Sequence, residues 1–118
     1  MSKLTPIIEE LINNDKRAWV NLRKGLVVSY QPDGLNFRVV LSRGKNSKPS
    51  AVEARVIYGE LITALSHLKR QATQPPRMEV QSIENKRGEL IDCVVITWSE
   101  YGQQMTLLDA ARPVVYSD

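Results

Sequence analysis

A chain of 118 residues suits one domain, and folding can bury enough surface for a core without disulfides or metals. The apolar content of 42% is slightly below the usual range of soluble domains and the charged content of 25% is ordinary, and neither value indicates a disordered chain. No apolar run approaches the roughly 18 residues of a membrane span, and the first residues lack a signal-peptide core, so we expect a cytoplasmic protein without membrane contact. The one cysteine, Cys93, excludes an internal disulfide and a cysteine-based metal site.

Charge is distributed unevenly along the chain. Residues 1–50 carry nine Lys or Arg against four Asp or Glu, a net charge of +5, while residues 51–118 carry seven against nine, a net charge of −2. The two values together give the net charge of +3. A basic first half indicates an anionic partner, although solvated strand and loop surfaces explain the same charges.

The first predicted elements are a helix and an ambiguous segment. Apolar residues at helical spacing predict a helix over residues 4–13, with Pro6 in its first turn. Residues 15–24 fit a short helix that ends at Gly25, or the start of a strand that runs from Trp19 to Gln31. We favour the strand, which directs Trp19, Asn21, Arg23 and Ser29 away from the core.

Residues 25–42 predict a β-hairpin. Two apolar runs flank Pro32, Asp33 and Gly34, which are residues that favour a chain reversal. After the turn the sequence alternates. Leu35, Phe37, Val39 and Leu41 share the core side, and Asn36, Arg38 and Ser42 share the solvent side.

The middle of the chain predicts a loop, a third strand and a second helix. Residues 43–50 contain no apolar side chain other than that of a proline and are predicted as a basic loop. Residues 51–57 alternate and predict a strand, although the same residues can open a helix at Ser50. Residues 59–71 have helical spacing, and the two prolines at 75 and 76 stop this helix.

A second hairpin is predicted from residues 78–84 and 89–98 around the turn at 85–88. The later strand is apolar on both sides from Cys93 onward, which indicates a central strand covered on both faces. Residues 101–118 give no firm pattern, although 114–116 can form an edge strand. The fold class is therefore α+β over a single domain, 1–118. It has an antiparallel sheet of about five or six strands built from two hairpins, with an N-terminal helix and a central helix packed on one face.

The residues do not favour an enzyme. His67 is the one histidine and lies on a predicted helix without a second catalytic group beside it. Cys93 lies in the most apolar strand with no cation near it, so we expect an unreactive buried thiol. The glycines are dispersed singly and form no phosphate loop. We therefore expect no catalytic residue, no metal and no cofactor.

The stronger hypothesis is a small non-enzymatic module that binds nucleic acid, either single-stranded DNA or RNA, on a basic sheet face and loop. Arginine and lysine bind phosphates, and an exposed aromatic ring stacks on a base. The candidate residues are Trp19, Arg23, Lys24, Arg38, Arg43, Lys45 and Lys48, with Trp19 as the stacking ring. A core position is an equally good interpretation of Trp19, because large aromatic residues are mostly buried.

The order of elements over residues 25–70 resembles the single-stranded DNA-binding domains of the transcriptional positive-cofactor type. Asp33-Gly34 corresponds to their first turn, and Lys48-Pro49 falls in their basic loop. This resemblance implies a homodimer that binds single strands. The alternative hypothesis is a protein–protein interaction or assembly factor that acts as a homo-oligomer without nucleic acid. It would use the apolar stripe of residues 4–12 and the segment 105–116.

Overall fold

A computed structural model describes residues 4–22, 25–43 and 48–101 of the chain. Within these residues the chain forms two helices and a five-stranded antiparallel sheet with the strand order β1-β2-β3-β5-β4. The elements are α1 (Leu4–Asn13), β1 (Ala18–Asn21), β2 (Val27–Asp33), β3 (Asn36–Ser42), α2 (Ala51–His67), β4 (Arg77–Glu84) and β5 (Leu90–Ser99). The predicted α+β class is confirmed. Neither of these helices is long and apolar enough to cross a membrane.

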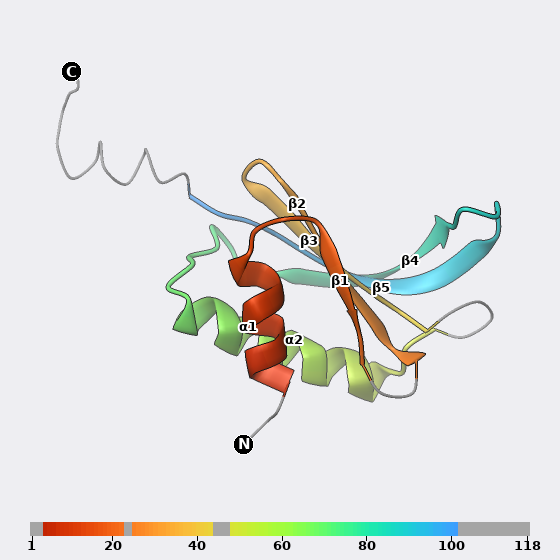
Figure 1. The fold of residues 1–118 in the computed structure, drawn as a ribbon, viewed down its shortest axis with the longest axis horizontal. Helices are drawn as coiled ribbons and strands as arrows, with labels where there is room; N and C mark the ends of the chain where they lie inside the picture. Colours follow the sequence, from red (N-terminus) through yellow and green to blue (C-terminus); the bar gives the residue numbers. More distant parts are fainter. Residues whose placement is uncertain (1–3, 23–24, 44–47, 102–118) are drawn as a thin grey trace, which may run out of the picture.

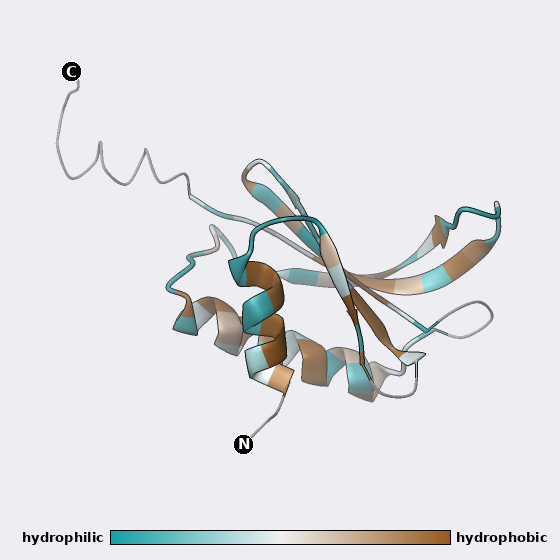
Figure 2. Ribbon diagram, in the orientation of Figure 1, coloured by the Kyte–Doolittle hydropathy of each residue, from teal (hydrophilic) through white to brown (hydrophobic). Residues whose placement is uncertain are grey.

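Both helices cover the same face of the sheet (Figure 1). The core contains residues of one parity from the central strands, such as Val39 of β3 and Ile96 of β5, packed against Ile12 of α1 and Leu61 of α2. Hydrophobic residues therefore line the helices and strands where they meet (Figure 2). We call the opposite side of the sheet, which carries neither α1 nor α2, the open face.

Helix α1 has the predicted bounds, and most of its apolar stripe is buried, although Ile7 is 36% exposed. Ile8, Leu11 and Ile12 belong to the core, which leaves them unavailable to a partner. Two polar contacts attach α1 to α2. Thr5 Oγ1 donates a hydrogen bond to the Glu60 carboxylate, and Glu9 Oε2 lies 2.5 Å from Nδ1 of His67.

The prediction of one strand from residue 19 to residue 31 is wrong, because the chain reverses within it. β1 and β2 pair antiparallel, with Trp19 opposite Ser29 and Val20 opposite Val28. The backbone N–H of Leu22 donates to the carbonyl of Leu26, and Gly25 adopts φ +74. The residues on both sides of this turn share one parity, so a continuous strand and a tight hairpin give the same alternation.

The predicted hairpin over residues 25–42 is present, but its turn lies two residues later than expected. β2 continues through Pro32 and Asp33, and the turn consists of Gly34 and Leu35. Gly34 adopts φ +65, a conformation that glycine accepts most readily. Pro32 is tolerated because β1 does not extend far enough to pair with it. Leu35, predicted on the core side, is therefore an exposed turn residue.

The predicted strand over residues 51–57 is wrong, because these residues form the first half of α2. Ser50 Oγ accepts from the backbone N–H of Glu53, and the Glu53 carboxylate accepts from the backbone N–H of Ser50. This capping box satisfies N–H groups that the first helical turn leaves unpaired. The buried residues Ala54, Ile57 and Leu61 then follow helical spacing. The order of elements that resembled the positive-cofactor domains is consequently not present.

The capping box gives a test of this helix start. We expect Ser50→Ala to lower the free energy of unfolding by about 1 kcal/mol, the usual cost of losing an N-cap side chain. Urea unfolding followed by circular dichroism measures the change. Ser66→Ala, at an exposed position near the other end of α2, is the matched control and should change stability by less than about 0.5 kcal/mol.

Glu53 also makes the stability of this end of α2 depend on pH. Hydrogen bonds from Arg43 and then from the Ser50 backbone lower the pKa of Glu53 from 4.5 to about 2. Because the folded-state pKa is the lower one, the stabilisation is complete above about pH 4.5 and is lost as the pH falls towards 2. We expect Glu53→Gln to be less stable than the wild type at pH 7 and to approach it at pH 3. If the urea midpoints of the wild type and of Glu53→Gln differ by the same amount at pH 7 and at pH 3, this assignment is contradicted.

The second hairpin is confirmed, with β4 and β5 joined through a turn at residues 85–88. The Asn85 side chain accepts hydrogen bonds from the backbone N–H groups of Arg87 and Glu89, and Gly88 adopts φ +79. β5 lies between β3 and β4 and is buried on both faces. Val94, Ile96 and Trp98 join the main core, while Cys93 and Val95 form a small cluster with Val40 on the open face. The expected central strand and buried thiol are thus confirmed.

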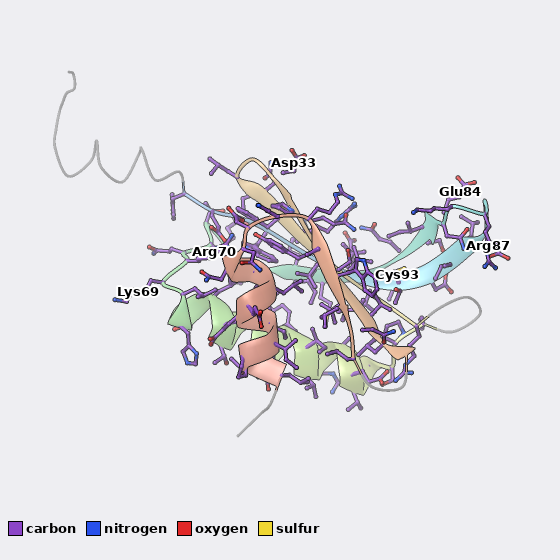
Figure 3. All side chains as sticks on the ribbon, viewed as in Figure 1. Asp33, Lys69, Arg70, Glu84, Arg87 and Cys93 are labelled. Carbon is purple, nitrogen blue, oxygen red and sulfur yellow. The ribbon has the colours of Figure 1, made fainter. Side chains whose placement is uncertain are left out.

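Arg70 joins the end of α1 to the sheet in a partly buried polar cluster (Figure 3). Its Nε donates to both carboxylate oxygens of Glu100, at 3.2 and 2.9 Å, and its Nη1 donates to the carbonyl of Ile12. Its Nη2 donates to the Tyr30 hydroxyl at 3.1 Å, and its guanidinium carbon lies 4.7 Å from the centroid of the Phe37 ring. Burial is the main cause that raises the pKa of Tyr30, so the protonated hydroxyl donates to Asp15 at 2.7 Å.

Candidate nucleic-acid interface

A row of polar side chains crosses the open face of the sheet. Arg38 of β3 lies opposite Gln31 of β2 on one side and Thr97 of β5 on the other, and Thr97 lies opposite Arg77 of β4. Arg17 lies directly before β1, next to the pair of Ala18 and Tyr30, and it lines the same cavity as Gln31. We call Arg17, Arg38 and Arg77 the arginine row. Neighbouring strands lie about 4.8 Å apart, so successive arginines of the row are separated by about 10 Å at their backbones.

The arginine row lines one cavity of about 760 Å³. The cavity lies at the end of the sheet that carries the β2–β3 turn, where Figure 3 labels Asp33. Residues with hydrogen-bonding side chains surround it, including Gln31, Asn36, Thr97 and Ser99. Phe37 and Trp98 also border it, although their side chains are buried in the core. Guanidinium groups, an amide and hydroxyls around one cavity are suited to binding a phosphate together with a polar group attached to it.

Arg38 is held in place by a neutral partner. Its Nε and Nη2 donate to Gln31 Oε1 at 3.0 and 2.5 Å, and Gln31 Nε2 donates to Ser29 Oγ at 3.2 Å. Because the amide orients the guanidinium without neutralising it, the full positive charge of Arg38 remains on the open face.

The arginine row differs from Arg43 and Arg70, which lie on the helix side of the sheet and are paired with carboxylates. Arg43 pairs with Glu53, and Arg70 pairs with Glu100. Within the part of the chain that the structure describes, no carboxylate lies within ion-pair distance of any member of the arginine row. An anionic ligand on the open face therefore does not have to displace an internal carboxylate.

Trp19 lies on the same face as the arginine row. It is two residues beyond Arg17 on β1 and opposite Ser29, and 67% of its surface is exposed. The other tryptophan, Trp98, is 5% exposed and stacks with Phe37 at a centroid distance of 5.6 Å. The exposed alternative for Trp19 is therefore correct, because its parity directs it away from the helices. Trp19 does not line the cavity, but an exposed indole ring on the same sheet face as cationic groups is an arrangement in which a base stacks while phosphates are bound.

The seven residues predicted as binding residues do not form one set. Trp19 and Arg38 lie on the open face, whereas Arg43 follows the end of β3 and is directed to Glu53 at the start of α2. Lys48 is exposed just before α2 and does not line the cavity. Arg23, Lys24 and Lys45 lie outside the described residues.

Arg17 and Arg77 are the members of the row that sequence reasoning did not select. Arg17 falls in the ambiguous segment before β1, and Arg77 directly follows the two prolines of a connector. The alignment of Arg77 with Arg38 depends on the strand order, in which β5 is inserted between β3 and β4. The alignment of Arg17 with Arg38 depends on the pairing of β1 with β2. Period-two alternation assigns each residue a face but does not determine which strands are neighbours.

No known protein family, curated protein or solved structure matched this chain.

Proposed function

We propose that the protein binds single-stranded nucleic acid on the open face of its sheet. The arginine row contacts the phosphates, and Trp19 stacks on an unpaired base. The observation that carries this proposal is the arginine row itself, in which three arginines without carboxylate partners among the described residues line one cavity. Guanidinium groups bind phosphate oxygens in bidentate geometry, and stacking tolerates any base, so this ligand needs no sequence-specific contact.

Several features support a single strand over a duplex. Trp19 offers the flat face of an exposed ring, and a base inside a duplex is already stacked on both sides. The cavity also has a size suited to one nucleotide, because ligand pockets typically measure about 300–1,000 Å³. A sheet face with cationic and aromatic residues is a common arrangement in proteins that bind single strands.

The alternative of an assembly factor loses one of its two proposed surfaces. Most of the apolar stripe of residues 4–12 is occupied, because Ile8, Leu11 and Ile12 belong to the core and Ile7 is the one exposed member of the stripe. The other surface, 105–116, lies outside the described residues. Self-association therefore requires a different surface.

Trp19 provides a direct test of the proposed function. We expect a single-stranded oligonucleotide of about 16 nucleotides, titrated at low salt, to quench the tryptophan fluorescence and to be released by added salt. Trp19→Phe should abolish the quenching, because the remaining Trp98 is buried. Trp19→Ala should weaken binding about tenfold, since one stacked base contributes about 1–3 kcal/mol.

The outcomes separate the two parts of the proposal. If the wild type retains no single-stranded DNA or RNA at low salt, nucleic-acid binding is rejected. If the wild type binds and Trp19→Ala binds equally well, phosphate contact remains but the stacking role of Trp19 is rejected. A duplex of the same length should bind more weakly than the single strand, and equal or tighter duplex binding would contradict the assignment of strandedness.

A further inference from the structure

β4 has a free edge. It pairs with β5 on one side, and no strand lies on its other side within the described sheet. β4 contains eight residues, whereas the opposite edge strand β1 contains four. A long free edge presents backbone N–H and C=O groups that can pair with another strand.

The free edge also exposes apolar side chains on the face that the helices cover elsewhere. Met78 lies opposite Ile96 and Val80 lies opposite Val94, both of which belong to the core, but Met78 is 39% exposed and Val80 is 56% exposed. The hairpin of β4 and β5 extends past the N-terminal end of α2, so the helix does not cover the part of the hairpin near its turn (Figures 1 and 2). Leu90, near the far end of the same hairpin, is exposed as well.

We propose that β4 pairs antiparallel with the β4 strand of a second copy of this chain, about a two-fold axis at Val80. The result is a homodimer with one continuous sheet. Closed two-fold dimers are the commonest oligomers, and edge pairing satisfies the backbone groups of both strands at once.

Side-chain parity and charge select the position of the axis. A two-fold axis perpendicular to the sheet keeps each face on its own side, so only residues of equal parity lie opposite each other. An axis at Val80 places Val80 against the partner's Val80 on the helix-covered side, and Glu79 against the partner's Gln81 on the open face. Gln81 Nε2 already donates to Glu79 Oε2 at 3.1 Å within one chain, so the two groups are chemically matched. An axis at Glu79 would oppose two carboxylates, and an axis at Gln81 would place Glu79 against an apolar Ile83. The axis at Val80 places Arg77 against Ile83, but it opposes no like charges and gives Glu79 a hydrogen-bonding partner.

This dimer leaves the proposed nucleic-acid interface accessible. The two-fold axis keeps the open faces of both protomers on the same side of the joined sheet, where each retains its arginine row. The dimer does not depend on nucleic-acid binding, and its test is made in high salt so that bound polyanions do not link two copies.

A cysteine at the axis tests the register. Cross-strand partners have Cβ atoms about 5 Å apart, so two thiols at position 80 can form a disulfide after a small adjustment. We expect Val80→Cys to give a covalent dimer upon mild oxidation, detected on a non-reducing gel. The wild type, whose Cys93 is buried with a pKa raised by desolvation, should remain uncrosslinked. Val52→Cys, at an exposed apolar position on α2, is the matched control and should crosslink at least tenfold more slowly.

A charge at the same position tests the assembly without a crosslink. The wild type should be a dimer by light scattering coupled to size exclusion in high salt, and Val80→Lys should be a monomer with unchanged circular dichroism, because the exposed Val80 is not needed for folding. A monomeric wild type overturns the proposal, including the case in which β4 is covered by another part of the same chain. A dimer that persists in Val80→Lys, or equal crosslinking of Val52→Cys, also overturns it.

Discussion

Replacing Arg70 by alanine is expected to lower the free energy of unfolding by about 3 kcal/mol, the largest effect of any single substitution proposed for this chain. The Arg70 side chain is 16% exposed and the Glu100 side chain is 12% exposed, so their ion pair is poorly solvated. Without the guanidinium, the Glu100 carboxylate loses its countercharge, and the carbonyl of Ile12 and the hydroxyl of Tyr30 each lose a donor. Urea unfolding followed by circular dichroism measures the loss.

Two further variants, Arg55→Ala and Glu100→Ala, test whether the loss of stability comes from the Arg70 cluster. Arg55→Ala removes the same side chain from an exposed position on α2 and should change stability by less than about 0.5 kcal/mol. Glu100→Ala alone should also be destabilising, and the double variant should cost less than the sum of the two single variants, because both remove the same interaction. Equal stabilities of the Arg70→Ala and Arg55→Ala variants would show that the cluster is not important for the fold.

The sequence predicts this fold well where the pattern of apolar and turn residues is compatible with only one secondary structure. The helical stripe of residues 4–13 and the turn after residue 84 each allow one structure: α1 has the predicted bounds, and β4 and β5 lie within one residue of theirs. Residues 51–57 have two solutions, because Val52, Ala54 and Val56 alternate while Ala54, Ile57 and Leu61 recur at helical spacing. The capping box at Ser50 favours the helix, and it outweighs the alternation because it satisfies backbone N–H groups.

The sequence predicts the candidate site less completely than it predicts the fold. Parity assigns Trp19 and Arg38 to the solvent side, and the structure agrees. Sequence reasoning places Arg43 in a basic loop, and only the helical start of α2 brings Glu53 to it. Arg17 and Arg77 join Arg38 through lateral neighbours that are distant in sequence, so the arginine row becomes visible only once the strand order is known.

The double variant Arg38→Ala/Arg77→Ala is expected to weaken binding of a single-stranded oligonucleotide at least tenfold at low salt. Each phosphate contact to a single strand contributes about 0.7 to the slope of log affinity against log salt, so losing two contacts should reduce the magnitude of that slope by about 1.4. Fluorescence titration of Trp19 over a series of salt concentrations measures both quantities. Neither arginine has a carboxylate partner among the described residues, so the variant should keep the stability of the wild type.

The matched control is Arg55→Ala/Arg87→Ala, which removes the same net charge from exposed arginines that do not line the cavity. Arg55 lies on α2, and Arg87 lies in the β4–β5 turn at the far end of the hairpin (Figure 3). If binding reflects only the overall charge of the protein, both double variants lose the same affinity and the same salt slope. If the arginine row holds the phosphates, the control keeps the wild-type slope, because a distant charge changes the long-range field without releasing the counterions of a contacted phosphate.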